Sequence, residues 1–134
     1  MPTRGLIDTN IVIHLHALGP SPLPEEMLIS AVTLAELSAA PHYADAPGER
    51  ARRIGLLQHV EATFDPLPFA AEAARTFGLV SAAVLAIGRT SRRRVTDLMI
   101  ASIAIANDLP VYTTNPADFV GLDELLDVRA VSRP

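Results

Sequence analysis

Cysteine and lysine are both absent from this chain of 134 residues, and each absence removes a class of chemistry. Without cysteine there are no disulfides, no thiolate nucleophiles and no cysteine-ligated zinc sites, which fits a reducing cytoplasm. Without lysine there is no Schiff-base amine and no phosphate-loop lysine, and the lysine used by phosphoryl-aspartate receivers is also missing. All eleven basic residues are arginine. An aspartate-based site in this chain therefore has few chemistries left to serve.

Long apolar runs are absent too, because none approaches the roughly 18 residues that a membrane-spanning helix needs. The length predicts a single domain over residues 1–134, and a hydrophobic content of 49% predicts a compact cytoplasmic protein. A net charge of -4 is unusual for a nucleic-acid partner. If four acids gather at one site where a metal neutralises their charge, the remaining surface carries no net charge. The net charge therefore does not exclude RNA as a partner.

Short apolar segments alternate with helix-like segments along the chain. Strands are predicted at 5–7, 27–30, 64–67, 111–113 and 128–131, and helices at 11–15, from 33, 49–62, 69–87 and 95–106. The apolar stripe along 69–87 indicates either core packing or a dimer seam. The alternation predicts an α/β domain with a central, mostly parallel sheet whose strand ends come out at one edge.

Acidic residues recur near these strand ends. Asp8 follows the first strand and Glu36 the second, Asp97 opens the helix 95–106, and Asn115 and Asp118 follow the strand 111–113. If the ends converge, these carboxylates raise one another's pKa, and a divalent cation would remove the conflict. Carboxylate and amide oxygens suit Mg²⁺ or Mn²⁺ rather than zinc. The chemistry that best matches such a pocket is phosphodiester hydrolysis by a metal-activated water.

Each of these residues also has a structural interpretation. Asp8 and Asp97, or the threonine before Asp97, are favoured helix N-cap residues. Thr33 and Glu36 have the spacing of a capping box, and Asn115 before proline suits an ordinary turn. His14 and His16 do not share a helix face, which favours packing or surface roles over metal binding.

A basic loop over residues 88–94 precedes Asp97 directly. Arg92, Arg93 and Arg94 could hold phosphate groups beside the acids, since guanidinium groups match phosphate geometry. The alternative is a solvated loop that is kept polar for solubility.

Four segments, at 6–10, 33–37, 96–101 and 113–119, occur in an order and spacing that resemble the PIN-domain ribonucleases. The resemblance is greatest to the VapC-type toxins of VapBC toxin-antitoxin pairs. It implies a three-layer α/β/α fold with a central parallel sheet and a Mg²⁺- or Mn²⁺-dependent endonuclease that cuts RNA. It also implies a homodimer and a small VapB-type antitoxin that binds the toxin, giving a heterotetramer or a larger assembly.

The resemblance assigns Asp8 and Asp97 as direct metal ligands and Glu36 as a ligand or an orienter of the attacking water. The fourth acidic position of the family is variable; Asn115 is not acidic, so Asp118 is expected as an outer ligand. Residues expected to support the carboxylates or the substrate are Thr9, Thr113, Asn115, Arg92, Arg93 and Arg94.

Two other functions fit the same motifs. One is a housekeeping PIN nuclease of RNA processing that has no antitoxin. The other is a catalytically idle module that binds RNA or a protein partner, in which the acids would persist only as helix caps.

Overall fold

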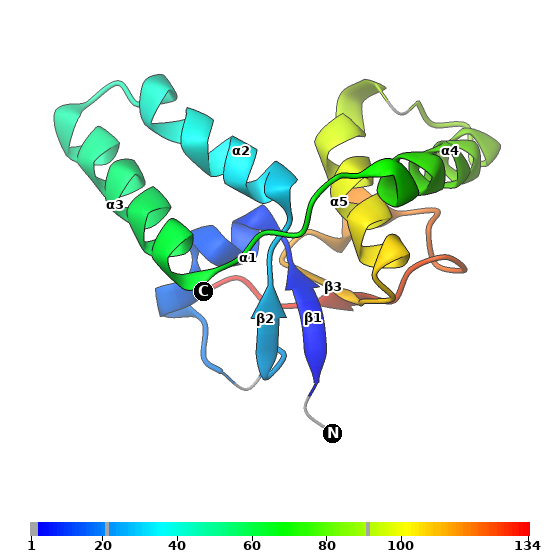
Figure 1. Cartoon of the computed structure of the whole chain (residues 1–134), viewed down its shortest axis with the longest axis horizontal. Coiled ribbons are helices and arrows are strands. Elements are labelled where there is room, and N and C mark those ends of the chain that lie inside the picture. The colour runs from blue at the N-terminus through cyan, green and yellow to red at the C-terminus, as the bar shows by residue number, and fades with distance from the viewer. Residues whose placement is uncertain (1–2, 21, 91) are drawn as a thin grey trace.

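The computed structural model describes residues 3–20, 22–90 and 92–134, and its strands form one parallel sheet with the order β2-β1-β3-β4. The strands are β1 (Arg4–Ile7), β2 (Glu26–Leu28), β3 (Val111–Thr113) and β4 (Val128–Ala130). The α-helices are α1 (Thr9–Ile13), α2 (Ala31–Ala39), α3 (Pro47–Thr63), α4 (Ala71–Ala86) and α5 (Val95–Ala106). Short 3₁₀ helices are η1 (Leu15–Ala17), η2 (Ala40–Tyr43), η3 (Arg92–Arg94) and η4 (Pro116–Phe119). Figure 1 shows the sheet below two pairs of helices.

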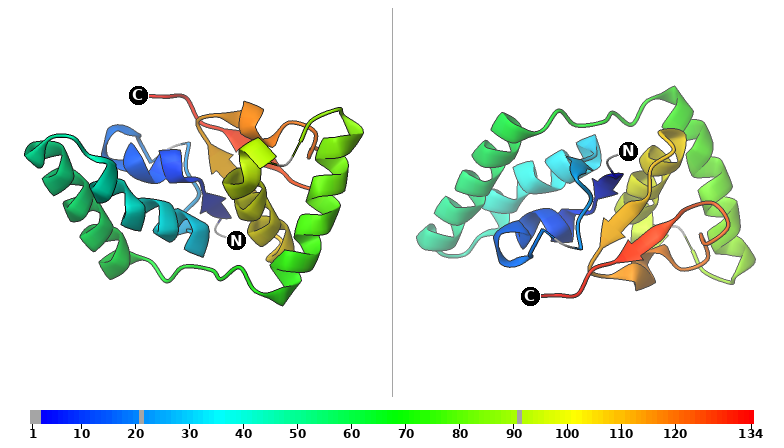
Figure 2. Two further views of the ribbon diagram at one scale, coloured as in Figure 1. Left: turned by 90° about the horizontal axis from the view of Figure 1, so that it is seen from above. Right: turned by 90° about the horizontal axis from the view of Figure 1, so that it is seen from below.

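Two hydrophobic cores lie on opposite faces of the sheet. Leu6 and Ile7 are neighbours in β1, so their side chains point to opposite faces, and both are fully buried. Leu6 belongs to the core formed with α4 and α5, whereas Ile7 packs with α1, α2 and α3. The helix pairs accordingly lie on either side of the strands (Figure 2). The predicted three-layer α/β/α arrangement is confirmed.

Helix α5 covers residues Val95–Ala106, the range predicted from the sequence. Its central residues, Leu98 and 100–104, are all buried, and it packs mainly against α4. A helix that is apolar on nearly every side is expected to be enclosed in this way. With twelve residues it is still too short to cross a membrane, and no other helix in the described ranges has the length and apolar character to do so.

The predicted strand at 64–67 is wrong. Only Leu67 pairs there, in a single parallel bridge with Ser30, and the bridge lies outside the four-stranded sheet. The Leu67 N–H donates to the Ile29 carbonyl at 2.9 Å, and its carbonyl accepts from the Ala31 N–H at 2.8 Å. Pro66 and Pro68 on either side have no N–H to continue the ladder, which limits the pairing to one residue.

Two of the capping predictions are wrong and one is confirmed. Ser30, not Thr33, caps α2, because the Ser30 hydroxyl accepts from the Thr33 N–H at 3.0 Å. At α5 the N-cap is Arg94 without a side-chain cap, so Asp97 lies inside the first turn. Asp8 does cap α1. Glu36 and Asp97 are therefore not engaged as caps, and their carboxylates can serve another purpose.

Candidate metal centre

Asp8 leaves the end of β1 and is held on both carboxylate oxygens. Its Oδ1 accepts the cap bond from the Thr9 N–H at 2.8 Å. Its Oδ2 accepts from Thr113 Oγ1 at 2.9 Å and from Asn10 Nδ2 at 3.1 Å. Only 3% of the residue is exposed. The cap role and a site role therefore coexist in one side chain, since the cap uses one oxygen and the pocket network uses the other.

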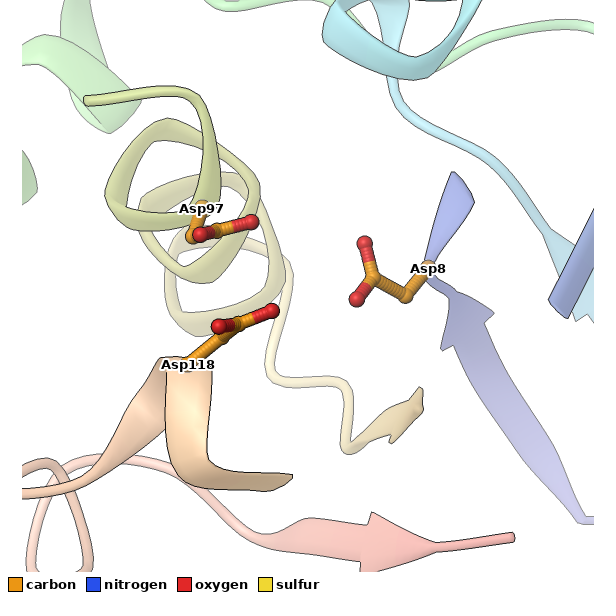
Figure 3. A group of neighbouring side chains, drawn as sticks. All are labelled: Asp8, Asp97 and Asp118. Atoms are coloured by element: carbon orange, nitrogen blue, oxygen red, sulfur yellow. The ribbon is translucent and has the colours of Figure 1, made fainter. Parts of the chain in front are cut away.

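Asp97 and Asp118 face Asp8 from two other elements. Asp97 lies in the first turn of α5 and Asp118 in η4. One carboxylate oxygen from each of the three aspartates lies within 4.8 Å of the other two, and Figure 3 shows the three side chains directed toward a common space. The topology brings them together because β1 and β3 are adjacent parallel strands that end at the same edge.

The charges in this group conflict with one another. Burial raises the pKa of Asp97, and the negative charges of Asp118, Asp8 and Glu36 raise it further, to about 7, while Arg94 opposes the change. Burial also raises the pKa of Asp8; hydrogen bonds from Thr113 and the Thr9 N–H oppose this, and the charges of Glu36 and Asp118 add to it. Arg94 offsets only part of the negative charge of this group, and a divalent cation would supply the rest.

Glu36 stands beside this group without belonging to its compact part. It is an exposed residue of α2 whose Oε1 accepts from Thr9 Oγ1 at 2.7 Å. Thr9 Oγ1 is also 3.0 Å from Thr33 Oγ1, and Ser30 Oγ donates to Thr33 Oγ1 at 3.3 Å. A chain of hydroxyl groups thus links the start of α2 to the start of α1 and holds the Glu36 carboxylate at Thr9, the residue after Asp8.

Asn10 and Thr33 are site residues that sequence reasoning missed. Asn10 Oδ1 accepts from the Thr114 N–H at 3.1 Å, so one side chain links the loop after β3 to Asp8. The signal for Asn10 was present, since it directly follows Asp8-Thr9 in the first motif. The site role of Thr33 was not predicted, because its spacing to Glu36 was interpreted as a capping box.

The sequence also matches known proteins of one family. Residues 5–125 match the sequence profile of the PIN domain. The chain belongs to the PIN domain family. It is 32% identical over 133 residues to ribonuclease VapC5 of Mycobacterium tuberculosis, a match that covers 97% of this chain and 96% of that protein.

Solved structures of VapBC proteins agree with the fold. The crystal structure of VapBC-5 from Mycobacterium tuberculosis matches with a TM-score of 0.83 and 32% identity, covering 98% of this chain and 100% of that one. VapBC2 from Rickettsia felis, bound to a DNA fragment of its promoter, matches with a TM-score of 0.73 at 19% identity, covering 97% and 100% of the two chains. At that lower identity the likeness shows the fold alone.

In this PIN domain, Asp118 belongs to the carboxylate group. Asn115 is the residue before η4, and its backbone N–H donates to Thr113 Oγ1 at 3.0 Å. The same Thr113 hydroxyl donates to Asp8. The backbone N–H of Asn115 therefore supports the first aspartate through Thr113, while Asp118, three residues later, presents its carboxylate to Asp8 and Asp97.

The arginines before Asp97 are not equivalent in this PIN domain. Arg94 Nη1 donates to Asp118 Oδ1 at 3.0 Å and to the Ala117 carbonyl at 3.2 Å. Arg92 is exposed, and its backbone N–H donates to the Thr90 hydroxyl at 3.2 Å. The side chain of Arg93 lies outside the described part of the chain. Arg94 is thus the arginine for which a contact with the carboxylate group is described.

The histidines considered in the sequence lie away from the carboxylates. His14 and His16 are exposed, and the ring centroid of His16 is 6.2 Å from that of His59 in α3. Both line a groove of about 660 Å³ between the α1–η1 segment and the α2–α3 pair. Among the described residues neither belongs to a cluster with metal-ligand geometry, in line with the predicted surface role.

Proposed function

We propose that this PIN domain is an endoribonuclease, acting as the toxin of a toxin-antitoxin pair, that hydrolyses RNA phosphodiester bonds with a divalent cation. The observation that carries the proposal is the convergence of Asp8, Asp97 and Asp118 from three separate elements to within 4.8 Å. The name of the relative, ribonuclease VapC5, supports the reaction. The whole chain, residues 1–134, is proposed as one such domain.

The donor set fits Mg²⁺, with Mn²⁺ as a substitute. Hard carboxylate oxygens are the preferred ligands of both ions, and the raised pKa of Asp97 indicates a group that lacks counter-charge. When bound, such a cation activates water and neutralises charge on the phosphate. Asp8 and Asp97 are the proposed direct ligands, with Asp118 as an outer ligand.

The other polar residues have supporting roles in this proposal. Thr113 and Asn10 fix the carboxylate of Asp8, so that its free lone pairs face the pocket. Thr9 fixes Glu36, which we assign as an additional ligand or as the group that orients the attacking water. We also assign Arg92 and Arg94 of η3 to the RNA backbone, which carries one negative charge per phosphate, and Arg93 keeps the role predicted from the sequence.

A protein partner is part of the proposal. The matched crystal structures are complexes of the VapBC type, which supports a VapB-type antitoxin for this chain as well, in a heterotetramer or larger assembly built on a toxin homodimer. The groove between α1, α2 and α3 offers an antitoxin segment apolar walls at Ile13, Leu37 and Leu56 and charged groups at Glu49 and Arg52. A cytoplasmic location remains a prediction.

The test compares the wild-type protein with Asp97→Asn, and uses Asp45→Asn as a matched control. Asp45 is an exposed acid in the connection between η2 and α3, outside the carboxylate group. Each variant is expressed under control in a bacterial host, and new RNA 5′ ends are mapped across the transcriptome. Growth arrest with cleavage at defined sites is expected for the wild type and Asp45→Asn, and neither for Asp97→Asn.

A Mn²⁺ titration of the purified proteins separates the alternatives. An enzyme shows saturable Mn²⁺ binding that Asp97→Asn weakens, whereas an idle RNA- or protein-binding module shows no saturable site. Cleavage that causes no growth arrest, and that a co-expressed neighbouring small protein does not inhibit, would favour a housekeeping nuclease. Unchanged cleavage and Mn²⁺ affinity in Asp97→Asn would refute the assignment of this pocket.

A further inference from the structure

The carboxylate group already has one cationic neighbour, the guanidinium of Arg94. Arg94 Nη1 lies 3.0 Å from Asp118 Oδ1, and the same nitrogen donates to the Ala117 carbonyl. The side chains are 30% and 23% exposed, so the ion pair is partly shielded from solvent. Arg94 also stands at the end of η3, directly before α5, three residues from Asp97. The pair therefore joins the segment that carries one candidate ligand to the segment that carries another.

A guanidinium and a divalent cation are poorly compatible in this space. Asp118 presents one carboxylate to the pocket, and an oxygen of that carboxylate lies within 4.8 Å of oxygens from Asp8 and Asp97. A cation among these oxygens would lie close to Arg94 in a setting where like charges are only partly screened. A guanidinium displaced from Asp118 would remain beside the carboxylate group, with a planar fork of donors that matches a phosphate.

We infer that Arg94 is an exchangeable counter-charge: it holds Asp118 in the metal-free protein and transfers to an RNA phosphate when the cation binds. The inference rests on the proposed function of the carboxylate group as a cation site. It divides the arginines of η3 by role. Arg94 couples metal loading to substrate binding, whereas exposed Arg92 adds to the general attraction for RNA.

The exchange predicts that removing Arg94 strengthens metal binding. Mn²⁺ affinity is measured by the loss of the free-ion electron paramagnetic resonance signal, at pH 8.5 so that the carboxylates are ionised. Arg94→Gln should bind Mn²⁺ about tenfold more tightly than the wild type, since a charge-assisted hydrogen bond no longer has to be broken. Arg92→Gln removes the same charge two residues away and is expected to change the affinity by less than about twofold.

A double-mutant cycle tests whether the effect passes through Asp118. In the Asp118→Asn background the carboxylate partner is absent, so Arg94→Gln should lose most of its effect on Mn²⁺ affinity. An equal gain in Mn²⁺ affinity in both backgrounds would overturn the exchange. It would indicate only a general repulsion between Arg94 and the cation. Thermal unfolding of each variant checks that it is folded. Arg94→Lys, which keeps the positive charge without the planar guanidinium, should bind Mn²⁺ with an affinity close to that of the wild type.

RNA binding provides a second test of the exchange. With a short single-stranded RNA and Ca²⁺ as the cation, Arg94→Gln should lower RNA affinity about tenfold, and in chelator it should lower it by less than about twofold. Arg92→Gln should weaken binding equally under both conditions. Equal effects of Arg94→Gln in Ca²⁺ and in chelator would contradict the exchange. If the wild type shows no saturable Mn²⁺ site, the proposed function itself fails, which is distinguishable from failure of the exchange alone.

Discussion

At the scale of single residues, the carboxylate group opposes the stability of the metal-free protein. Asp97 has an ordinary pKa of 3.8 and a pKa of about 7 in the folded chain. The folded state therefore holds this proton over a pH range in which the unfolded state has lost it. Stability from this group is full below about pH 4 and is lost as the pH rises through 7.

We predict that Asp97→Asn stabilises the metal-free protein, and more so at pH 8 than at pH 5. The expected gain in the free energy of unfolding at pH 8 is about 1–2 kcal/mol, after allowance for solvent screening of a partly exposed group. Urea unfolding in chelator measures it. Asp45→Asn should show no such pH dependence, and a gain of equal size at both pH values would contradict the explanation. Saturating Mn²⁺ should stabilise the wild type much more than Asp97→Asn.

The hydroxyl of Thr33 is predicted to matter for both stability and rate. Thr33 is fully buried, and its Oγ1 contacts Thr9 Oγ1, which holds Glu36. Thr33→Val keeps the shape but leaves the Ser30 hydroxyl without this acceptor, at an expected cost of about 1–2 kcal/mol in urea unfolding. RNA cleavage should slow roughly tenfold as Glu36 loses its orientation. Thr33→Ser should restore both quantities; a loss of stability with an unchanged rate would limit Thr33 to a structural role.

The positions of the four acids, and Thr9 and Thr113 as partners of the carboxylates, could be proposed from the sequence, whereas the parts played by Asn10 and Thr33 could not. Asp8, Glu36, Asp97 and Asp118 follow strand ends or open helices, and parallel topology brings such positions to one edge. Hydrogen bonds depend on which residue begins a helix, and a shift of three residues at α2 turned a predicted cap, Thr33, into a buried hydroxyl of the network. The spacing of residues in the sequence does not by itself show which of two nearby residues begins a helix.

At the scale of elements, the contact between β1 and β3 depends on a glycine. The ring of Tyr112 in β3 covers Gly5 in β1, and a Cβ on Gly5 would meet Tyr112 Cδ1 at 2.6 Å. Tyr112 is 5% exposed and has the guanidinium of Arg129 5.7 Å from its ring centroid, so the ring has little room to move. These two strands carry Asp8 and Thr113 at their ends, so their spacing also sets the geometry of the site.

We predict that Gly5→Ala lowers the free energy of unfolding by about 1–3 kcal/mol, the usual cost of overpacking. Gly78→Ala is the matched control. Gly78 lies in α4 with no atom within 4 Å of the added Cβ, so alanine there should raise stability by about 0.5–1 kcal/mol. Chemical denaturation of both variants measures the difference. A neutral Gly5→Ala would mean that the two strands separate at little cost.

Helix α5 and strand β3 could be predicted to the residue, whereas the segment 64–67 and the bounds of the other elements could not. Helix α5 matches its predicted range because its residues from Leu98 to Ala106 are apolar apart from Ser102. The segment 64–67 has the composition of a strand, but the prolines at 66 and 68 remove the donors that a ladder needs. Pairing with the rest of the fold, rather than the strand preference of the residues themselves, decides whether such segments form strands.

At the scale of the whole molecule, one face of α4 has no partner among the residues that the structure describes. Leu79 and Leu85 are 63% and 62% exposed. The predicted stripe along 69–87 lies on the other face, where Ala73, Val80 and Val84 are buried in the core. Of the two interpretations of that stripe, core packing is confirmed for these three residues, and a dimer seam, if formed by α4, would use the opposite, exposed face.

We therefore predict that the homodimer forms through the exposed face of α4. Burial of a leucine side chain contributes about 2 kcal/mol, so Leu79→Arg should weaken dimerisation at least about 30-fold, and Leu79→Arg with Leu85→Arg should give a monomer. Sedimentation velocity across a concentration series measures this. Tyr43→Arg is the control, because Tyr43 is 78% exposed in η2, at the far end of the other helix pair. A dimer that survives both arginines and dissociates in Tyr43→Arg would move the interface to the α2–α3 side, in competition with the proposed antitoxin groove.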